Sequence, residues 1–310
     1  MTTLSDKSTA EAAALIDGPY AWMRLGVCLV LGSLGSAGFW GVVVVLPVVQ
    51  AEFQVDRADA SLPYTLTMIG FAVGNVVIGR FSDRFGIVLP VAASALALGL
   101  GFVGAAFAET VWVFAILQGV LIGIGTAATF GPLIADISHW FRRRRGFAVA
   151  IAATGNYVGG ALWPVAMQLF LEDEGWRNTY IGMGIVCIAL MLPLTLMLPV
   201  CLIVALALGR PNPFSFGGAR NDRFDPARPG IVRYLRHPVL AALALWAGAH
   251  LVPNGDLAHV LLFGLFAAFA LLGMRIIDRR KARLTGAEWD RLRNAVAEAP
   301  LAPRPLSWRG

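Results

Sequence analysis

Long apolar stretches alternate with short polar breaks along most of this sequence. Each stretch holds about 20 residues, the length that an α-helix needs to cross a hydrocarbon core about 30 Å thick. Hydrophobic residues make up 57% of the chain and charged residues 14%, which excludes a water-soluble globule. We therefore predict an all-α polytopic membrane protein with about eight transmembrane helices, over residues 21–49, 62–80, 89–108, 111–137, 146–171, 179–206, 232–252 and 257–276.

The cationic residues gather in alternate loops, although the net charge of +6 would by itself suggest nucleic-acid binding. Such an asymmetry is typical of cytoplasmic loops, so we predict a bacterial inner-membrane protein with both termini cytoplasmic, the lipid bilayer as its partner and no nucleic acid. Residues 1–20 lack the order of a cleaved signal peptide and are expected to form a cytoplasmic tail. The basic loops contain Arg80 and Arg84, then Arg142, Arg143, Arg144 and Arg145, then Arg210, Arg220 and Arg223, and finally Arg279–Arg283.

A composition change near residue 195 predicts a domain boundary. Before it, residues 21–194 hold six of the apolar stretches. After it, we expect a region over 195–284 with a polar loop at 209–231 and a transmembrane hairpin at 232–276, followed by a cytoplasmic tail at 285–310. In that tail, Trp289, Leu292 and Val296 share one face, which predicts a short interfacial helix. The three cysteines, Cys28, Cys187 and Cys201, are interpreted as packing residues.

Two motifs give the first six stretches a family resemblance. Gly79, Asp83, Arg84 and Gly86 follow the second stretch in the order of the loop signature of the major facilitator superfamily. The resemblance implies that a glycine there permits close helix contact and that the acid caps a neighbouring helix. Ile87, Val88 and Leu89 depart from this signature, because they stand where basic residues are usual.

The second motif runs from His139 through the arginine run 142–145 and continues to the turn at Gly175-Trp176-Arg177. Together with Gly38-Phe39-Trp40-Gly41, it resembles the monocarboxylate and oxalate-formate branch of the superfamily, over about residues 21–190. The resemblance covers one six-helix half only. It implies transport of small organic anions at a midplane site between two halves, which a homodimer would complete.

Polar residues of the fourth and fifth stretches are the candidates for a substrate pathway, because the resemblance implies that helices one, four and five line it. An interhelical hydrogen bond explains each of them equally well. No ionisable side chain lies deep in the first six stretches, and such a group is the usual mark of proton coupling. The candidates are Gln118, Thr126, Thr129, Asn156 and Tyr157.

The last region carries a dense series of motifs of its own. Its resemblance, over about residues 195–290, is to the carboxyl-terminal part of the NnrU family, membrane proteins linked to nitric oxide metabolism. No catalytic residue is predicted, and whether the region is an enzyme stays open. The motif residues are Arg236, His237, Pro238, His250, Asp256 and His259.

Cofactor chemistry is bounded by helix geometry. His237 and His250 stand thirteen residues apart on one predicted helix, about 20 Å at 1.5 Å per residue, so they do not share a metal. His250 and His259 flank a short turn near Asp256 and are a minority candidate for a metal or haem site, against plain hydrogen bonds. Arg236-His237-Pro238 also distantly resembles membrane methyltransferases that bind S-adenosylmethionine, but the paired acids of that motif are absent here.

The sequence leaves three interpretations of function open. The chain is a transporter or a half-size relative of one, or an NnrU-type protein in which the first six helices are a scaffold without transport activity. The third interpretation is a chimera of two gene fragments, joined near residue 195, without a single function.

Overall fold

Helices provide the regular secondary structure of residues 15–216 and 218–299, which a computed structural model describes, and no strand occurs in these ranges. The predicted class, an all-α polytopic membrane protein, is confirmed. The described chain divides into a first unit, Ile16–Thr195, and a second unit that begins at Leu196. Each unit is described by itself.

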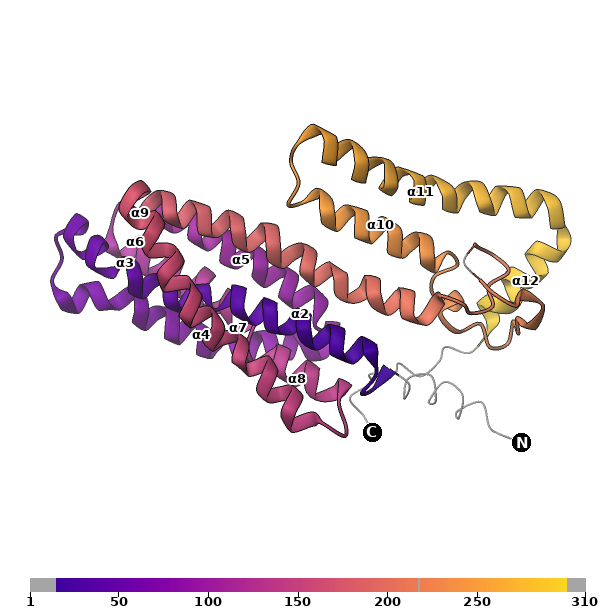
Figure 1. Cartoon of the computed structure of the whole chain (residues 1–310), viewed down its shortest axis with the longest axis horizontal. Coiled ribbons are helices and arrows are strands. Elements are labelled where there is room, and N and C mark those ends of the chain that lie inside the picture. The colour runs from indigo at the N-terminus through magenta and orange to yellow at the C-terminus, as the bar shows by residue number, and fades with distance from the viewer. Residues whose placement is uncertain (1–14, 217, 300–310) are drawn as a thin grey trace. The chain divides into compact units, whose positions relative to one another are not determined.

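The first unit is a bundle of long antiparallel helical segments, which we call rods (Figure 1). Its first rod is interrupted at Ser36, and its fourth contains a π-helix, η1, in place of one α-helical turn. In order, its elements are α2 (Pro19–Gly35), α3 (Ala37–Phe53), α4 (Arg57–Phe85), α5 (Val88–Ala106), α6 (Val111–Leu117), η1 (Gln118–Gly123), α7 (Ile124–Ala127), α8 (Gly131–Trp140) and α9 (Arg145–Ala207).

Local sequence explains where these rods begin and end. The Asp56 side chain accepts a hydrogen bond from the Asp59 amide at 2.9 Å and so caps α4. Gly86 ends the same helix with φ = 78°, a conformation that suits glycine. In α9, Gly175 has φ = 74° and ψ = 166°, which breaks the 63-residue segment into two helices. The second of these, residues 176–207, continues past the boundary between the units.

Six helical segments of the described chain are long and apolar enough to cross a membrane. Two of the predicted stretches are joined within α9, so seven of those stretches are accounted for. The remaining one was predicted too long: α10 covers Pro238–Leu251, 14 residues, or about 21 Å. It starts at Pro238 rather than Val232 because residues Gly230–Arg233 form a 3-10 turn and proline suits a helix start.

Close backbone contact between α4 and the fourth rod holds the first unit together. A Cβ atom at Gly70 would lie 1.9 Å from the carbonyl oxygen of Gly119, and one at Gly123 would lie 2.6 Å from that of Thr67. Small residues let helices approach in this way where lipid offers no hydrophobic driving force. Glycine at these positions is therefore a requirement of packing.

The second unit pairs α10 with α11 (Leu257–Thr285) and closes with α12 (Ala287–Glu298). The loop before α10 contains two 3-10 turns, η2 (Asn221–Arg223) and η3 (Gly230–Arg233). Phe214 and Val232 of this loop are buried with Trp289 and Val296 of α12. The apolar face of α12 thus packs on protein, which corrects the prediction of an interfacial helix lying on lipid.

Candidate functional site

Gln118, the first pathway candidate, is fully buried at the start of η1. Its Nε2 atom donates to the Tyr180 hydroxyl of α9 at 2.6 Å, while its Oε1 atom has no partner among the described residues. Tyr180 is itself buried, with its ring edge-on to Phe102 at 5.0 Å. An unpaired amide oxygen is costly in an apolar bundle, so this oxygen is a ready acceptor for a polar group.

Two threonines of the fourth rod pack closely against glycines of the first rod. Thr126 and Thr129 are buried, and a Cβ atom at Gly38 or Gly35 would lie 2.0 or 2.1 Å from their respective Oγ1 atoms. Thr129 donates to the Thr126 carbonyl at 2.7 Å, whereas Thr126 Oγ1 has no partner within the described chain. These contacts give both residues a packing role between the first and fourth rods.

The two candidates on α9 differ in exposure. Asn156 is half-buried, and its Oδ1 atom is buried without a partner among the residues described. Tyr157 is 70% exposed. Their role in a pathway stays a prediction, and Asn156 joins Gln118 as a residue with unused hydrogen-bonding capacity.

The major-facilitator loop motif lies on the last turn of α4 and the turn after it. A Cβ atom at Gly79 would meet nothing within 4 Å, and α5 has no side-chain cap at Ile87, the residue that precedes it. Asp83 and Arg84 are exposed. The implied close contact at Gly79 and the implied cap by Asp83 are therefore absent from this unit, and Gly86, with its positive φ, is the motif residue with a clear local role.

The sequence did not indicate a buried ion pair that joins α2 to α8 at one end of the first unit. Arg24 is 5% exposed and donates from Nε and Nη2 to the Asp136 carboxylate at 2.6 and 2.8 Å. Its Nη1 atom donates to the Tyr20 hydroxyl at 2.7 Å, and its guanidinium lies 4.8 Å from the Trp140 ring centroid. The two partners are 112 residues apart in sequence, so no local pattern indicated the pair.

The arginine run is tied to the same end of the bundle. The Asp17 carboxylate accepts the backbone amides of Arg142 and Arg143 at 3.3 and 3.2 Å, and the Asp17 amide donates to the Trp140 carbonyl at 2.9 Å. The side chains of all four arginines are exposed. The loop backbone is therefore fixed, while its positive charge faces outward.

A second cluster joins the rods at the other end of the bundle, and it explains the Gly-Trp-Arg motif. Arg177 donates to the Glu52 carboxylate at 2.6 Å and to the carbonyl of Ala108 at 2.9 Å, and also to that of Ala106. The indole of Trp176 donates to the same carboxylate. The turn that Gly175 permits thus joins α9 to the ends of α3 and α5.

In the second unit, Arg236 and His237 share one carboxylate. Arg236 Nη1 donates to Asp278 of α11 at 2.6 Å, and His237 Nε2 lies 2.9 Å from the other Asp278 oxygen. Burial lowers the pKa of His237 and outweighs Asp278, which acts to raise it. The predicted Arg-His-Pro motif is therefore a link between the start of α10 and the end of α11, with Pro238 at the first helical position.

The outer turn holds the other two histidines. His250 Nδ1 lies 2.8 Å from the Trp246 carbonyl, and His259 Nδ1 bonds to Asp256, whose side chain also caps α11. The hydrogen bonds from His259 lower the pKa of Asp256. Within the described residues, no group of three or more His, Cys, Asp or Glu side chains is arranged to hold a metal.

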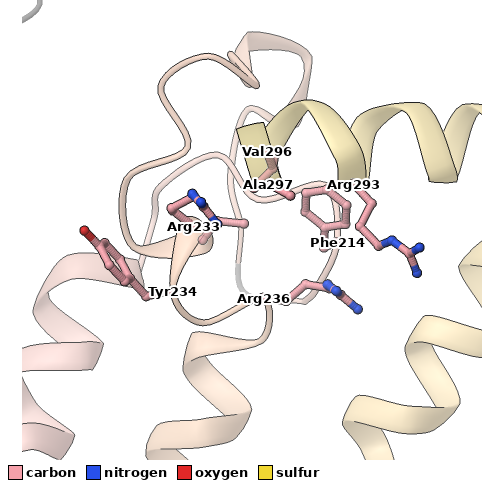
Figure 2. A pocket seen from close by; sticks show the side chains of 8 residues that line it. Phe214, Arg233, Tyr234, Arg236, Arg293, Val296 and Ala297 are labelled. Atoms are coloured by element: carbon pink, nitrogen blue, oxygen red, sulfur yellow. The ribbon is translucent and has the colours of Figure 1, made fainter. Parts of the chain in front are cut away.

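A cavity of about 160 Å³ opens between the loop of the second unit and α12 (Figure 2). Three arginines are among the residues that line it, Arg233, Arg236 and Arg293. A cationic lining does not suit the sulfonium of S-adenosylmethionine, and Asp278 is followed by Arg279 where a second acid would be needed. The residues present therefore do not fit that cofactor.

These features define a polytopic helical membrane protein, and its first unit is similar to transporters. The chain is 29% identical to human monocarboxylate transporter 11 over 194 residues, which are 61% of this chain and 41% of that protein. It is 28% identical to human monocarboxylate transporter 12 over 204 residues, 63% of this chain and 39% of that protein. An uncharacterized MFS-type transporter of Bacillus subtilis (strain 168), YcxA, is 33% identical over 150 residues, 48% of this chain and 36% of that protein.

The second resemblance is confirmed as well: residues 176–307 match the family model described as NnrU protein. This match begins earlier than the predicted residue 195 and includes the second helix of α9. The chain thus combines similarity to major-facilitator transporters with a match to the NnrU family model, and it spans about two fifths of the length of the two human transporters.

Proposed function

We propose that the first unit serves secondary transport of small monocarboxylates across a bacterial inner membrane, with both termini cytoplasmic. The observation that carries this proposal is the similarity to monocarboxylate transporters over 61% of the chain. The basic loops support the orientation, because cytoplasmic loops are rich in arginine. A second six-helix unit, supplied by another copy of this chain, would complete the substrate site between two halves.

The interior of the first unit supports a polar pathway. Gln118 Oε1 and Asn156 Oδ1 are buried acceptor atoms without partners among the described residues. A protonated carboxylic acid or a bound water would satisfy such atoms. The clusters around Arg24 and Glu52 fix the ends of the rods, so that the groups between them are held in register.

Uptake of labelled lactate into proteoliposomes tests this proposal. The full-length protein should accumulate lactate above empty liposomes, and Asn156→Ala should reduce the initial rate by about two- to tenfold, the effect of losing one neutral hydrogen bond worth about 0.5–1.5 kcal/mol. Thr154→Ala is the matched control, because Thr154 is exposed on the same helix and, among the described residues, its hydroxyl bonds to the Ala150 carbonyl. Absence of flux for every small monocarboxylate tried would sink the proposal.

A second candidate function is favoured by the NnrU match at residues 176–307. In this alternative the second unit serves nitrogen-oxide metabolism, and the first unit is its membrane scaffold. The cluster of Arg236, His237 and Asp278 would be its core. Replacing His237 with alanine should then impair growth on nitrite while Asn156→Ala does not, whereas the transport proposal expects Asn156→Ala to reduce lactate uptake and His237→Ala to leave it unchanged.

One observation separates both candidates from a chimera of two gene fragments. A long sequencing read across the codons for residues 185–205 should contain both units in one open reading frame. A genome in which the two parts lie in separate genes would remove the basis for a joint function.

A further inference from the structure

Arg24 of α2 is the buried arginine of the first unit, and no other arginine or lysine is buried in the described ranges. It faces α8, which packs beside α2 (Figure 1). The side chain of Arg24 is 5% exposed and that of its partner Asp136 is 15% exposed, so the carboxylate lies nearer to water. A buried guanidinium is costly without an anion beside it. The site therefore requires one negative charge next to Arg24 at all times.

The guanidinium holds that charge in the geometry that suits any small carboxylate. Its Nε and Nη2 atoms donate to the two different oxygens of Asp136, at 2.6 and 2.8 Å, which is the bidentate arrangement that arginine forms with carboxylates in general. A free monocarboxylate presents the same two oxygens to the same two donors. The Nη1 atom donates to the Tyr20 hydroxyl at 2.7 Å, and this bond holds the guanidinium in place when its other partner is exchanged.

The wall of this site contains a second donor that the ion pair leaves unused. Trp140 of α8 is 7% exposed, and its ring centroid lies 4.8 Å from the guanidinium carbon of Arg24. The Trp140 Nε1 atom is buried and has no acceptor among the described residues, although Asp136 stands four residues earlier on the same helix. A buried N–H group without an acceptor is costly. An oxygen of a ligand beside Arg24 would satisfy it.

We propose that a small monocarboxylate exchanges with Asp136 at the guanidinium of Arg24, and that Asp136 takes up one proton from water as it leaves. The inference rests on the proposed transport function and adds a binding site to it. The arriving anion adds one negative charge and the proton on Asp136 removes one, so the buried site stays neutral. Because the ion pair joins α2 to α8, the exchange also releases this contact between the first and fourth rods.

Other titratable groups surround the pair and decide which controls are needed. On α2 these are Tyr20 and Cys28, which act on the Arg24 charge. On α8, His139 is exposed, and a histidine can change its charge between pH 6 and 8, so His139→Gln is the control for the pH dependence. The remaining charged side chains at this end are exposed, or bonded to backbone amides in the case of Asp17: Arg80, Asp83 and Arg84 of α4, which packs on α8, and the arginine run 142–145.

Titration calorimetry of the purified full-length protein with L-lactate, in buffers of different ionisation enthalpy, counts the protons taken up on binding. Wild type and His139→Gln should take up about one proton per lactate, and their affinity should rise about tenfold for each unit by which the pH is lowered from 8 to 6. Asp136→Asn keeps the shape of the side chain but cannot be protonated. It should bind lactate without proton uptake, with an affinity that changes less than about twofold over the same range.

Two further variants test the guanidinium itself. Arg24→Met/Asp136→Leu removes both charges and should bind lactate at least about tenfold more weakly than the wild type. In Asp136→Ala, sodium acetate should occupy the vacant place and raise the SDS fraction at which the protein unfolds, whereas acetamide, or sodium chloride at the same ionic strength, should not.

Absent or pH-independent lactate binding by the wild type, unchanged binding in the double variant, or no effect of acetate on Asp136→Ala would overturn the inference. The transport proposal fails separately from it. Proton-linked binding at Arg24 in a protein that gives no lactate flux would sink the transport proposal and support this site, while flux without proton-linked binding would do the opposite.

Discussion

Breaking the buried pair between Arg24 and Asp136 should be the most destabilising single change in the first unit. Replacing Asp136 with alanine leaves the guanidinium of Arg24, which is 5% exposed, without its two carboxylate bonds at 2.6 and 2.8 Å. The Tyr20 hydroxyl remains its hydrogen-bond partner, but it carries no compensating charge. Removing one partner of a buried pair costs about 3–5 kcal/mol. The unfolded fraction should rise by at least about a hundredfold, since about 1.4 kcal/mol is a factor of ten.

Reversible unfolding of the full-length protein in mixed micelles of dodecyl maltoside and SDS, followed by circular dichroism, measures this change. The double variant Arg24→Met/Asp136→Leu removes both charges and keeps the volume, so it should be more stable than Asp136→Ala by at least about 2 kcal/mol. Trp140, which faces the guanidinium at 4.8 Å, then contacts a methionine. A loss below about 1 kcal/mol for Asp136→Ala, or a double variant as unstable as the single one, would refute the reasoning.

Three smaller effects follow from other contacts. Gly70→Ala should destabilise the protein by about 1–3 kcal/mol, because its Cβ meets the Gly119 carbonyl at 1.9 Å, whereas Gly79→Ala, with open space around it, should be neutral or stabilising in the same SDS titration. Arg177→Lys should lose about 1 kcal/mol or more, because a single ammonium does not reproduce the separate guanidinium contacts, and recovery of wild-type stability by lysine would contradict this. Burial lowers the pKa of His237 in the folded protein. Its contribution to stability is therefore complete above the unfolded pKa of about 6.5 and is lost as the pH falls below that value. The free energy of unfolding, measured between pH 7.5 and 5, should fall less steeply in His237→Gln, and an unchanged slope would exclude His237 as a cause of the pH dependence.

The positions of the rods were predictable because the length of each apolar stretch can be read from consecutive residues of the sequence. α5 begins and ends within two residues of its predicted bounds. α4 was predicted too short at its end, since Phe81 to Phe85 continue the helix with polar residues until Gly86. α10 was predicted too long because composition alone does not reveal that Pro238 starts it.

The contacts that define the sites were not predictable in the same way. The Arg24 pair and the cluster of Trp176 with Glu52 join residues more than a hundred positions apart. The π-helix at Gln118 depends on how the fourth rod packs, not on a local signal. Trp289 was correctly placed on an apolar helical face, but its neighbour is Phe214 of a distant loop rather than lipid. Tertiary packing decided each of these features.

Accessibility of engineered cysteines tests the central claim that the first unit crosses the membrane, with its two polar clusters on opposite sides. Glu52→Cys and Arg143→Cys mark the two ends of the bundle, and Cys28 and Cys187 are buried and should stay unlabelled. A membrane-impermeant maleimide should label Glu52→Cys in right-side-out vesicles and Arg143→Cys in inverted vesicles. Labelling of both positions from the same side would contradict the account.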